Sequence, residues 1–118
     1  MKAPLLKRVT EDEKGATAIE FALVAPALLS LIVAVINVSL LGLTSASLHY
    51  AVEEGARCAA VRLVCPEPRS RYFAPGPAPV FTLTSTVCGS LLSATVTFNL
   101  NAVLIQKSIQ LSAKACYP

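Results

Sequence analysis

The sequence from Phe21 to Leu48 reads FALVAPALLSLIVAVINVSLLGLTSASL and contains no charged residue. About 20 apolar residues are enough for a helix to cross a bilayer, so the sequence predicts at least one transmembrane helix here. At ~1.5 Å per residue this run would be ~42 Å long as a helix, which exceeds the ~30 Å hydrocarbon core. We therefore expect the helix to continue beyond the lipid surface. Pro26 lies inside the run, and transmembrane helices tolerate such a proline.

The composition of the 118-residue chain limits what it can be. Hydrophobic residues make up 54% and charged residues 14%, below the ~25% charged residues usual in soluble chains, and the length allows one small domain at most. The net charge of +3 is small and scattered, so we predict no nucleic-acid binding. The sequence has no phosphate-binding glycine loop, no nucleophile elbow and a single histidine, His49. We therefore predict neither an enzyme nor a cofactor.

Helical periodicity continues after the uncharged run, in HYAVEEGARCAAVRLV from His49 to Val64. One apolar stripe passes through Val52, Ala56, either Ala59 or Ala60, and Leu63. The sequence therefore predicts that the helix runs to about Val64, with its last part amphipathic.

The last third of the chain changes from helical to alternating periodicity. CPEPRSRYFAPGPAP, from Cys65 to Pro79, holds five of the eight prolines and predicts a loop. Alternate positions after it are apolar, namely Phe81, Leu83, Val87, Leu92, Ala94, Val96, Phe98, Leu100, Ile109, Leu111, Ala113, Ala115 and Tyr117. This pattern predicts about three antiparallel strands, with turns near Gly89 and from Asn101 to Lys107. The sheet needs a cover, which the helix stripe can supply, so the predicted fold is α+β.

Four cysteines, Cys58, Cys65, Cys88 and Cys116, all follow the uncharged run. An even number on one side of a membrane span indicates an oxidising compartment and disulfides. A zinc site is the alternative, but the sequence has no CxxC motif, and we predict no metal. Cys58 and Cys65 would lie ~10.5 Å apart along an intact helix, too far for a bridge. Either the helix breaks before Cys65, or each helix cysteine pairs with a strand cysteine.

The distribution of basic residues predicts the orientation. Lys2, Lys7, Arg8 and Lys14 precede the span, interspersed with Glu11, Asp12 and Glu13, whereas only Arg57 and Arg62 follow it closely. This bias predicts a single-pass membrane protein with a cytoplasmic N-terminus and the C-terminal domain on the opposite side of the membrane.

The start of the apolar segment carries a more specific signal. GATAIEFALVAP, from Gly15 to Pro26, resembles the N-terminal signature of TadE-like pseudopilins, minor components of the Tad (Flp) pilus machinery. The later AVEEGARCAAV is similar to the Gly-Ala-Arg-containing helix of that family. The resemblance implies that a prepilin peptidase cuts between Gly15 and Ala16. It also implies that Glu20 and Phe21 take part in subunit registration. The acids in the leader depart from the family pattern, as does the lack of a second acid in the helix.

Physical chemistry gives Glu20 a role that does not depend on the family. An ionised carboxylate in hydrocarbon is costly and needs a cation. Cleavage after Gly15 would create an α-amine at Ala16, about one helical turn from Glu20. The amine of a neighbouring subunit can pair with Glu20 and set the axial register between helices. The alternative is that Glu20 lies among the lipid headgroups and reaches water.

These inferences divide the chain into five segments: a cytoplasmic leader (1–15), a transmembrane helix (16–48), a periplasmic extension (49–65), a proline-rich loop (66–79) and a β-rich domain (80–118). The predicted function is a minor pilin that takes part in assembly or anchoring of a Tad pilus. Its predicted partners are the membrane, the prepilin peptidase, other pilins and the assembly platform. One alternative is an exported soluble domain with an ordinary signal peptide cut near Ala46. Another is a single-span membrane protein with a partner-binding domain.

Overall fold

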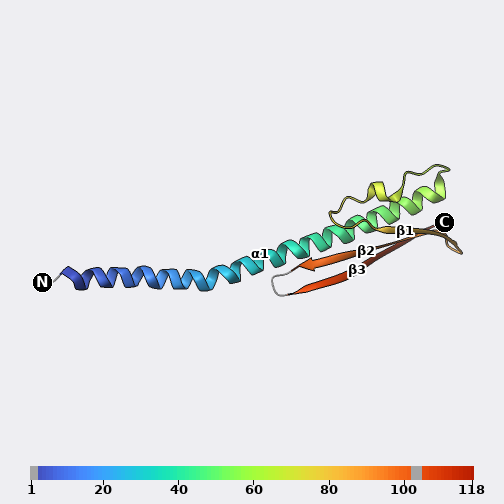
Figure 1. Ribbon diagram of the computed structural model, residues 1–118. Coiled ribbons are helices and arrows are strands. Elements are labelled where there is room, and N and C mark those ends of the chain that lie inside the picture. Colours follow the sequence, from blue (N-terminus) through green and yellow to red (C-terminus); the bar gives the residue numbers. More distant parts are fainter. Residues whose placement is uncertain (1–2, 102–104) are drawn as a thin grey trace. The chain divides into compact units, whose positions relative to one another are not determined.

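The part of the protein that the structure describes consists of one long helix, a short 3-10 turn and a three-stranded sheet (Figure 1). The computed structural model describes residues 3–101 and 105–118, with side chains from Gly15 onward. Its elements are α1 (Ala3–Val61), η1 (Pro68–Arg71), β1 (Val80–Thr86), β2 (Gly89–Asn101) and β3 (Gln106–Tyr117). The predicted α+β fold, with a long apolar helix followed by a three-stranded antiparallel sheet, is confirmed.

The chain divides into two compact units, Met1–Val35 and Ile36–Pro118. The described part of the first unit is helix alone, and the helix continues through Pro26. Its large apolar side chains are exposed, among them Ile19, Phe21, Leu23, Val24, Leu28, Leu29, Leu31, Ile32 and Val35. Since such a surface is unfavourable in water, this segment requires an apolar environment or a partner.

The second unit has a small core between α1 and one face of the sheet. Buried residues of the helix and of the two longer strands form it, namely Leu48, Val52, Ala56, Leu92, Ala94, Val96 and Ala113. Tyr72, Phe81, Leu111 and Ala115 pack around these residues. The prediction that a helical stripe covers the apolar face of the sheet is therefore confirmed, and the stripe begins earlier than expected, at Leu48.

The carboxyl end of α1 corrects one part of the prediction. The helix ends at Val61, before the expected end near Val64, and its last backbone contact is the Arg62 N–H donating to the Cys58 carbonyl at 2.9 Å. Leu63 was expected in the apolar stripe but is fully exposed. The chain leaves the helix here because Cys65 returns to form a disulfide with Cys58, with 5.8 Å between their Cα atoms.

The sheet is a meander in the order β1-β2-β3, with both strand pairs antiparallel. Thr86 pairs with Gly89 across the first turn, close to the predicted position. Gly89 has φ +118°, and a Cβ there would collide with the Tyr117 carbonyl oxygen and lie 2.7 Å from Cα of Pro118. Glycine is therefore required at this turn. The second predicted turn, from Asn101 to Lys107, includes residues 102–104, which lie outside the described residues.

Candidate functional site

The residues predicted for cleavage and registration all lie on α1. Gly15, Ala16, Glu20 and Phe21 are exposed, and Phe21 retains 74% of its accessible surface. A Cβ added to Gly15 would meet no atom within 4 Å. Among the described residues, neither close packing nor an unusual backbone conformation explains the glycine at position 15. The structure describes no side chain of the leader before it.

Glu20 is the single charged residue between Gly15 and Leu48. Ala16 and Val24 lie one helical turn to either side of it and are exposed as well, so Glu20 is surrounded by apolar surface. Among the side chains that the structure describes, none forms an ion pair with its carboxylate.

Helix α1 is long and apolar enough to cross a membrane over the segment Gly15–Val61. Its most apolar part is not buried inside the protein. These properties are consistent with a single-pass membrane segment or with a signal sequence near the N-terminus.

The part of α1 around Ser47 is joined to the proline-rich loop through the Ser47 side chain. Ser47 is fully buried, and its Oγ accepts hydrogen bonds from the backbone N–H groups of Phe73 at 2.9 Å and Ala74 at 3.3 Å. Thr44 is buried one turn earlier, and its hydroxyl donates to the Leu40 carbonyl at 2.8 Å. Sequence analysis missed this attachment, although small polar residues at helical spacing just before the amphipathic stripe are the signal that could have indicated it.

Tyr72 contributes a buried hydroxyl beside the same turn of the helix. Its oxygen makes no hydrogen bond of good geometry with the described residues. Burial raises the pKa of the Tyr72 phenol, and the nearby Thr44 side chain opposes part of that rise.

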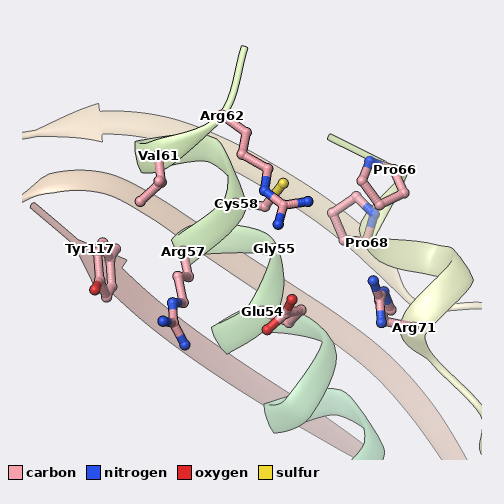
Figure 2. Close-up of a pocket in the computed structure, with 10 residues that line it drawn as sticks. All are labelled: Glu54, Gly55, Arg57, Cys58, Val61, Arg62, Pro66, Pro68, Arg71 and Tyr117. Atoms are coloured by element: carbon pink, nitrogen blue, oxygen red, sulfur yellow. The ribbon is translucent and has the colours of Figure 1, made fainter. Parts of the chain in front are cut away.

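The residues of the Gly-Ala-Arg sequence at positions 55–57 have three different environments, and Figure 2 shows Gly55 and Arg57. A Cβ on Gly55 would lie 2.5 Å from Cδ2 of Leu92 and 3.2 Å from Cγ of Pro68, so the helix approaches both the sheet and the loop closely here. Ala56 is buried in the core, whereas Arg57 is exposed. The first two residues are thus needed for packing, and Arg57 is available for contacts with other molecules.

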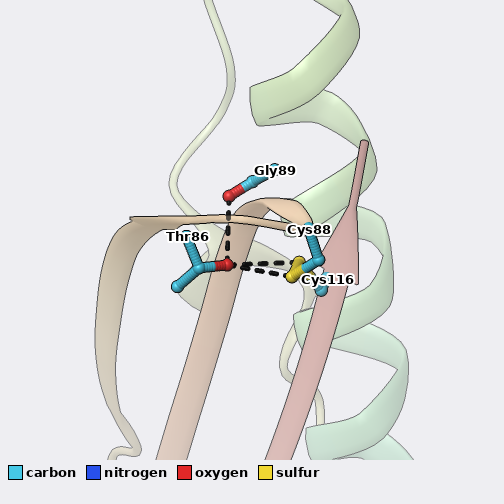
Figure 3. The surroundings of a disulfide bond; sticks show 4 residues. All are labelled: Thr86, Cys88, Gly89 and Cys116. Atoms are coloured by element: carbon cyan, nitrogen blue, oxygen red, sulfur yellow. Dashed lines mark hydrogen bonds between the residues drawn. A yellow bond between two sulfur atoms is a disulfide. The ribbon is translucent and has the colours of Figure 1, made fainter.

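Both disulfides lie in the second unit, and all four cysteines are paired. The helix does break before Cys65, so Cys58 bonds to Cys65 and the alternative of helix-to-strand pairing is wrong. Cys88, in the turn after β1, bonds to Cys116 on β3, and the Thr86 hydroxyl lies 2.9 Å from Sγ of Cys88 (Figure 3). The described residues contain no cluster of potential metal ligands.

Comparison with protein-family models matches residues 15–57 to the family described as TadE-like protein. The match begins at Gly15 and ends at Arg57, so it covers the apolar helix and the Gly-Ala-Arg sequence. No curated protein and no solved structure matches the chain. The family suggests a pilin-like protein that is associated with the Tad pilus machinery, a class that is typically non-enzymatic. Over residues 15–57, the chain is therefore similar to the TadE-like protein family.

Proposed function

We propose that the protein is a minor pilin, or pseudopilin, that takes part in the assembly or anchoring of a Tad pilus used for adherence. In this proposal a membrane prepilin peptidase cuts between Gly15 and Ala16, and α1 then packs with the helices of other pilins. The family match supports the proposal, because it begins at the glycine that would precede the cut bond.

The observation that carries the proposal is the position of Glu20 on an exposed part of α1, without an ion pair to any described side chain. Its carboxylate is exposed, and the apolar side chains around it are exposed too. In hydrocarbon this carboxylate would cost several kcal/mol unless it were paired. The α-amine at Ala16 of a neighbouring subunit supplies the charge and would fix the axial position of one helix against the next.

The same proposal places the C-terminal unit in the periplasm. Two disulfides fit an oxidising compartment, and the basic residues of the leader favour a cytoplasmic N-terminus. One face of α1 is covered by the loop and the sheet from Thr44 onward. We therefore place the carboxyl end of the lipid-embedded segment before Thr44, short of the end at position 48 that the sequence alone suggests.

Two alternatives make different predictions for the mature N-terminus. An ordinary signal peptide would be cut near Ala46, which lies inside α1 between the buried residues Thr44 and Ser47. That cut would remove Thr44 from its place beside Tyr72. A single-span binding protein would keep the whole leader.

Mass spectrometry of the membrane-bound protein distinguishes these functions. The full chain would be produced with a C-terminal tag in cells with and without a prepilin peptidase. We expect a mature form that begins at Ala16 in the first case and an intact leader in the second. A form that begins at Ser47, or one that starts at Met1 in both strains, would contradict the proposal.

Two glycine variants serve as a matched pair in this experiment. Gly15→Leu places a bulky side chain next to the cut bond and should abolish processing. Gly42→Leu adds the same side chain at another open position of α1, where a Cβ also meets no atom within 4 Å, and should leave processing unchanged. Equal processing of both variants would mean that the side chain at position 15 does not affect cleavage, which would contradict the proposed cut after Gly15.

A further inference from the structure

A groove of about 400 Å³ lies at the carboxyl end of α1, between that helix, the proline-rich loop and Tyr117 (Figure 2). Three arginines line it. Arg57 is on α1, Arg62 follows the end of the helix, and Arg71 is on η1. Glu54 is the single acid among the lining residues. The groove therefore carries more positive than negative charge.

The walls of the groove are fixed by contacts that do not involve the arginine side chains. The Cys58–Cys65 disulfide links the last turn of the helix to the start of the loop. Pro68, at the start of η1, packs against the position of Gly55. These contacts fix the three segments that carry Arg57, Arg62 and Arg71 around the groove.

None of the three arginines has a role in the fold that the structure shows. All three are exposed, and none of them forms an ion pair with a described carboxylate. The carboxyl end of α1 supplies only about half a negative charge. Among the lining residues, Glu54 and the helix end offset only part of the charge of the three arginines, so the groove favours an anion.

We propose that this groove binds an acidic segment of another protein, with carboxylates held by Arg57, Arg62 and Arg71. Guanidinium groups bind carboxylates through two parallel hydrogen bonds, so a cluster of arginines favours this chemistry. The volume lies within the range of specific ligand sites and fits a few side chains.

The charge of the chain indicates that the acidic segment belongs to a different protein. From His49 onward the sequence has six Lys and Arg residues and three Glu residues. A second copy presents the same positive excess and would be repelled. This site lies on the sheet-bearing unit and does not depend on cleavage at Gly15, so it is independent of the proposed function.

Binding of a fluorescent hexaglutamate peptide to the full chain in neutral detergent tests the proposal. We expect saturable binding that weakens as salt is added. Arg57→Gln, Arg62→Gln and Arg71→Gln should each weaken it about fivefold or more, since each removes a charge-assisted pair. Arg71→Lys keeps the charge but loses the two-pronged geometry, and it should give a smaller loss.

Arg69→Gln is the matched control. Arg69 lies on η1 two positions before Arg71 and is exposed, but it does not line the groove. Its substitution removes the same charge and should change the affinity less than twofold. Far-UV circular dichroism and an intact Cys58–Cys65 disulfide by mass spectrometry would establish that each variant is folded.

Four results would overturn the proposal. The first is no binding of hexaglutamate, and the second is equal binding of hexaglutamine. The third is an equal loss with Arg69→Gln and Arg71→Gln, which would mean that only overall surface charge matters. The fourth is binding of anionic phosphatidylglycerol vesicles through the same arginines without binding of the peptide, which would identify a lipid surface as the ligand.

Discussion

Gly55 of α1 packs directly against Leu92 of β2. A Cβ on Gly55 would lie 2.5 Å from Cδ2 of Leu92, and Leu92 is almost completely buried. Glycine usually weakens a helix by about 1 kcal/mol relative to alanine. Here the smallest residue lets the helix lie close to the sheet and to Pro68, so its low helix propensity is offset by packing.

Gly55→Ala should destabilise the folded unit by about 1–3 kcal/mol, because the new methyl group overlaps a side chain with little room to move. Gly42→Ala, at an open position of the same helix, should cause no loss. Thermal unfolding of the full chain in detergent, followed by circular dichroism, measures both. Leu92→Val removes the methyl group that would collide with the new Cβ. The double variant Gly55→Ala/Leu92→Val should therefore lose less stability than the sum of the losses of the two single variants. Strict additivity would disprove the contact.

Ser47→Ala should lower the free energy of unfolding by about 2 kcal/mol. The substitution removes the acceptor of the Phe73 and Ala74 N–H groups and leaves these donors without a partner. Chemical unfolding in detergent measures the change. Ser45→Ala, two positions away on the same helix and only partly buried, should change it by less than about 0.5 kcal/mol. If the two variants are equally stable, the loop is not held through Ser47.

Stability should decrease at alkaline pH through Tyr72. Burial raises the pKa of its phenol in the folded state, so the unfolded chain releases the proton first as the pH rises. The stabilisation is complete below pH ~10, the ordinary value, and is lost as the pH rises through the folded pKa. Tyr72→Phe should reduce this loss, whereas Tyr50→Phe, at an exposed position, should not. Unfolding curves between pH 8 and pH 11 measure the difference. Identical curves for wild type and Tyr72→Phe would show that ionisation of Tyr72 does not cause the loss of stability.

Glu20→Gln should reduce pilus output about tenfold or more while membrane insertion stays unchanged. The amide keeps the size of the side chain but loses the charge that pairs with an α-amine. Shed pili and membrane-bound protein can be quantified in the same cultures. Glu53→Gln removes an exposed carboxylate from the sheet-bearing unit and should have no effect on either. Normal pilus output from Glu20→Gln would refute the registration role.

Local periodicity was sufficient to predict most of the fold. The uncharged run predicted the helix, and the alternation through Leu92, Ala94 and Val96 predicted the buried face of the sheet. Both patterns indicate which side of a helix or strand is apolar. This depends only on residues that are close to one another in the sequence. Val52 and Ala56 were assigned to the covering stripe for the same reason.

Features that depend on distant residues could not be predicted in this way. The end of the helix is set by the return of Cys65 to Cys58, so periodicity wrongly extended the stripe to Leu63. Ser47 accepts hydrogen bonds from residues 26 and 27 positions away, and nothing next to it indicates those partners. The roles of Gly15 and Glu20 concern other molecules and remain predictions.

The Cys88–Cys116 disulfide determines how the C-terminal unit responds to mechanical tension. A force applied between the helix and the last residues passes from Cys88 to Cys116 through the sulfur atoms, and the chain between them carries no load. The two cysteines are 28 positions apart, so the disulfide prevents the extension of a segment that would be about 90 Å long when fully stretched. Most of β2 and β3 therefore stays closed in a covalent ring, and a stretched molecule can lengthen mainly through the proline-rich loop and β1.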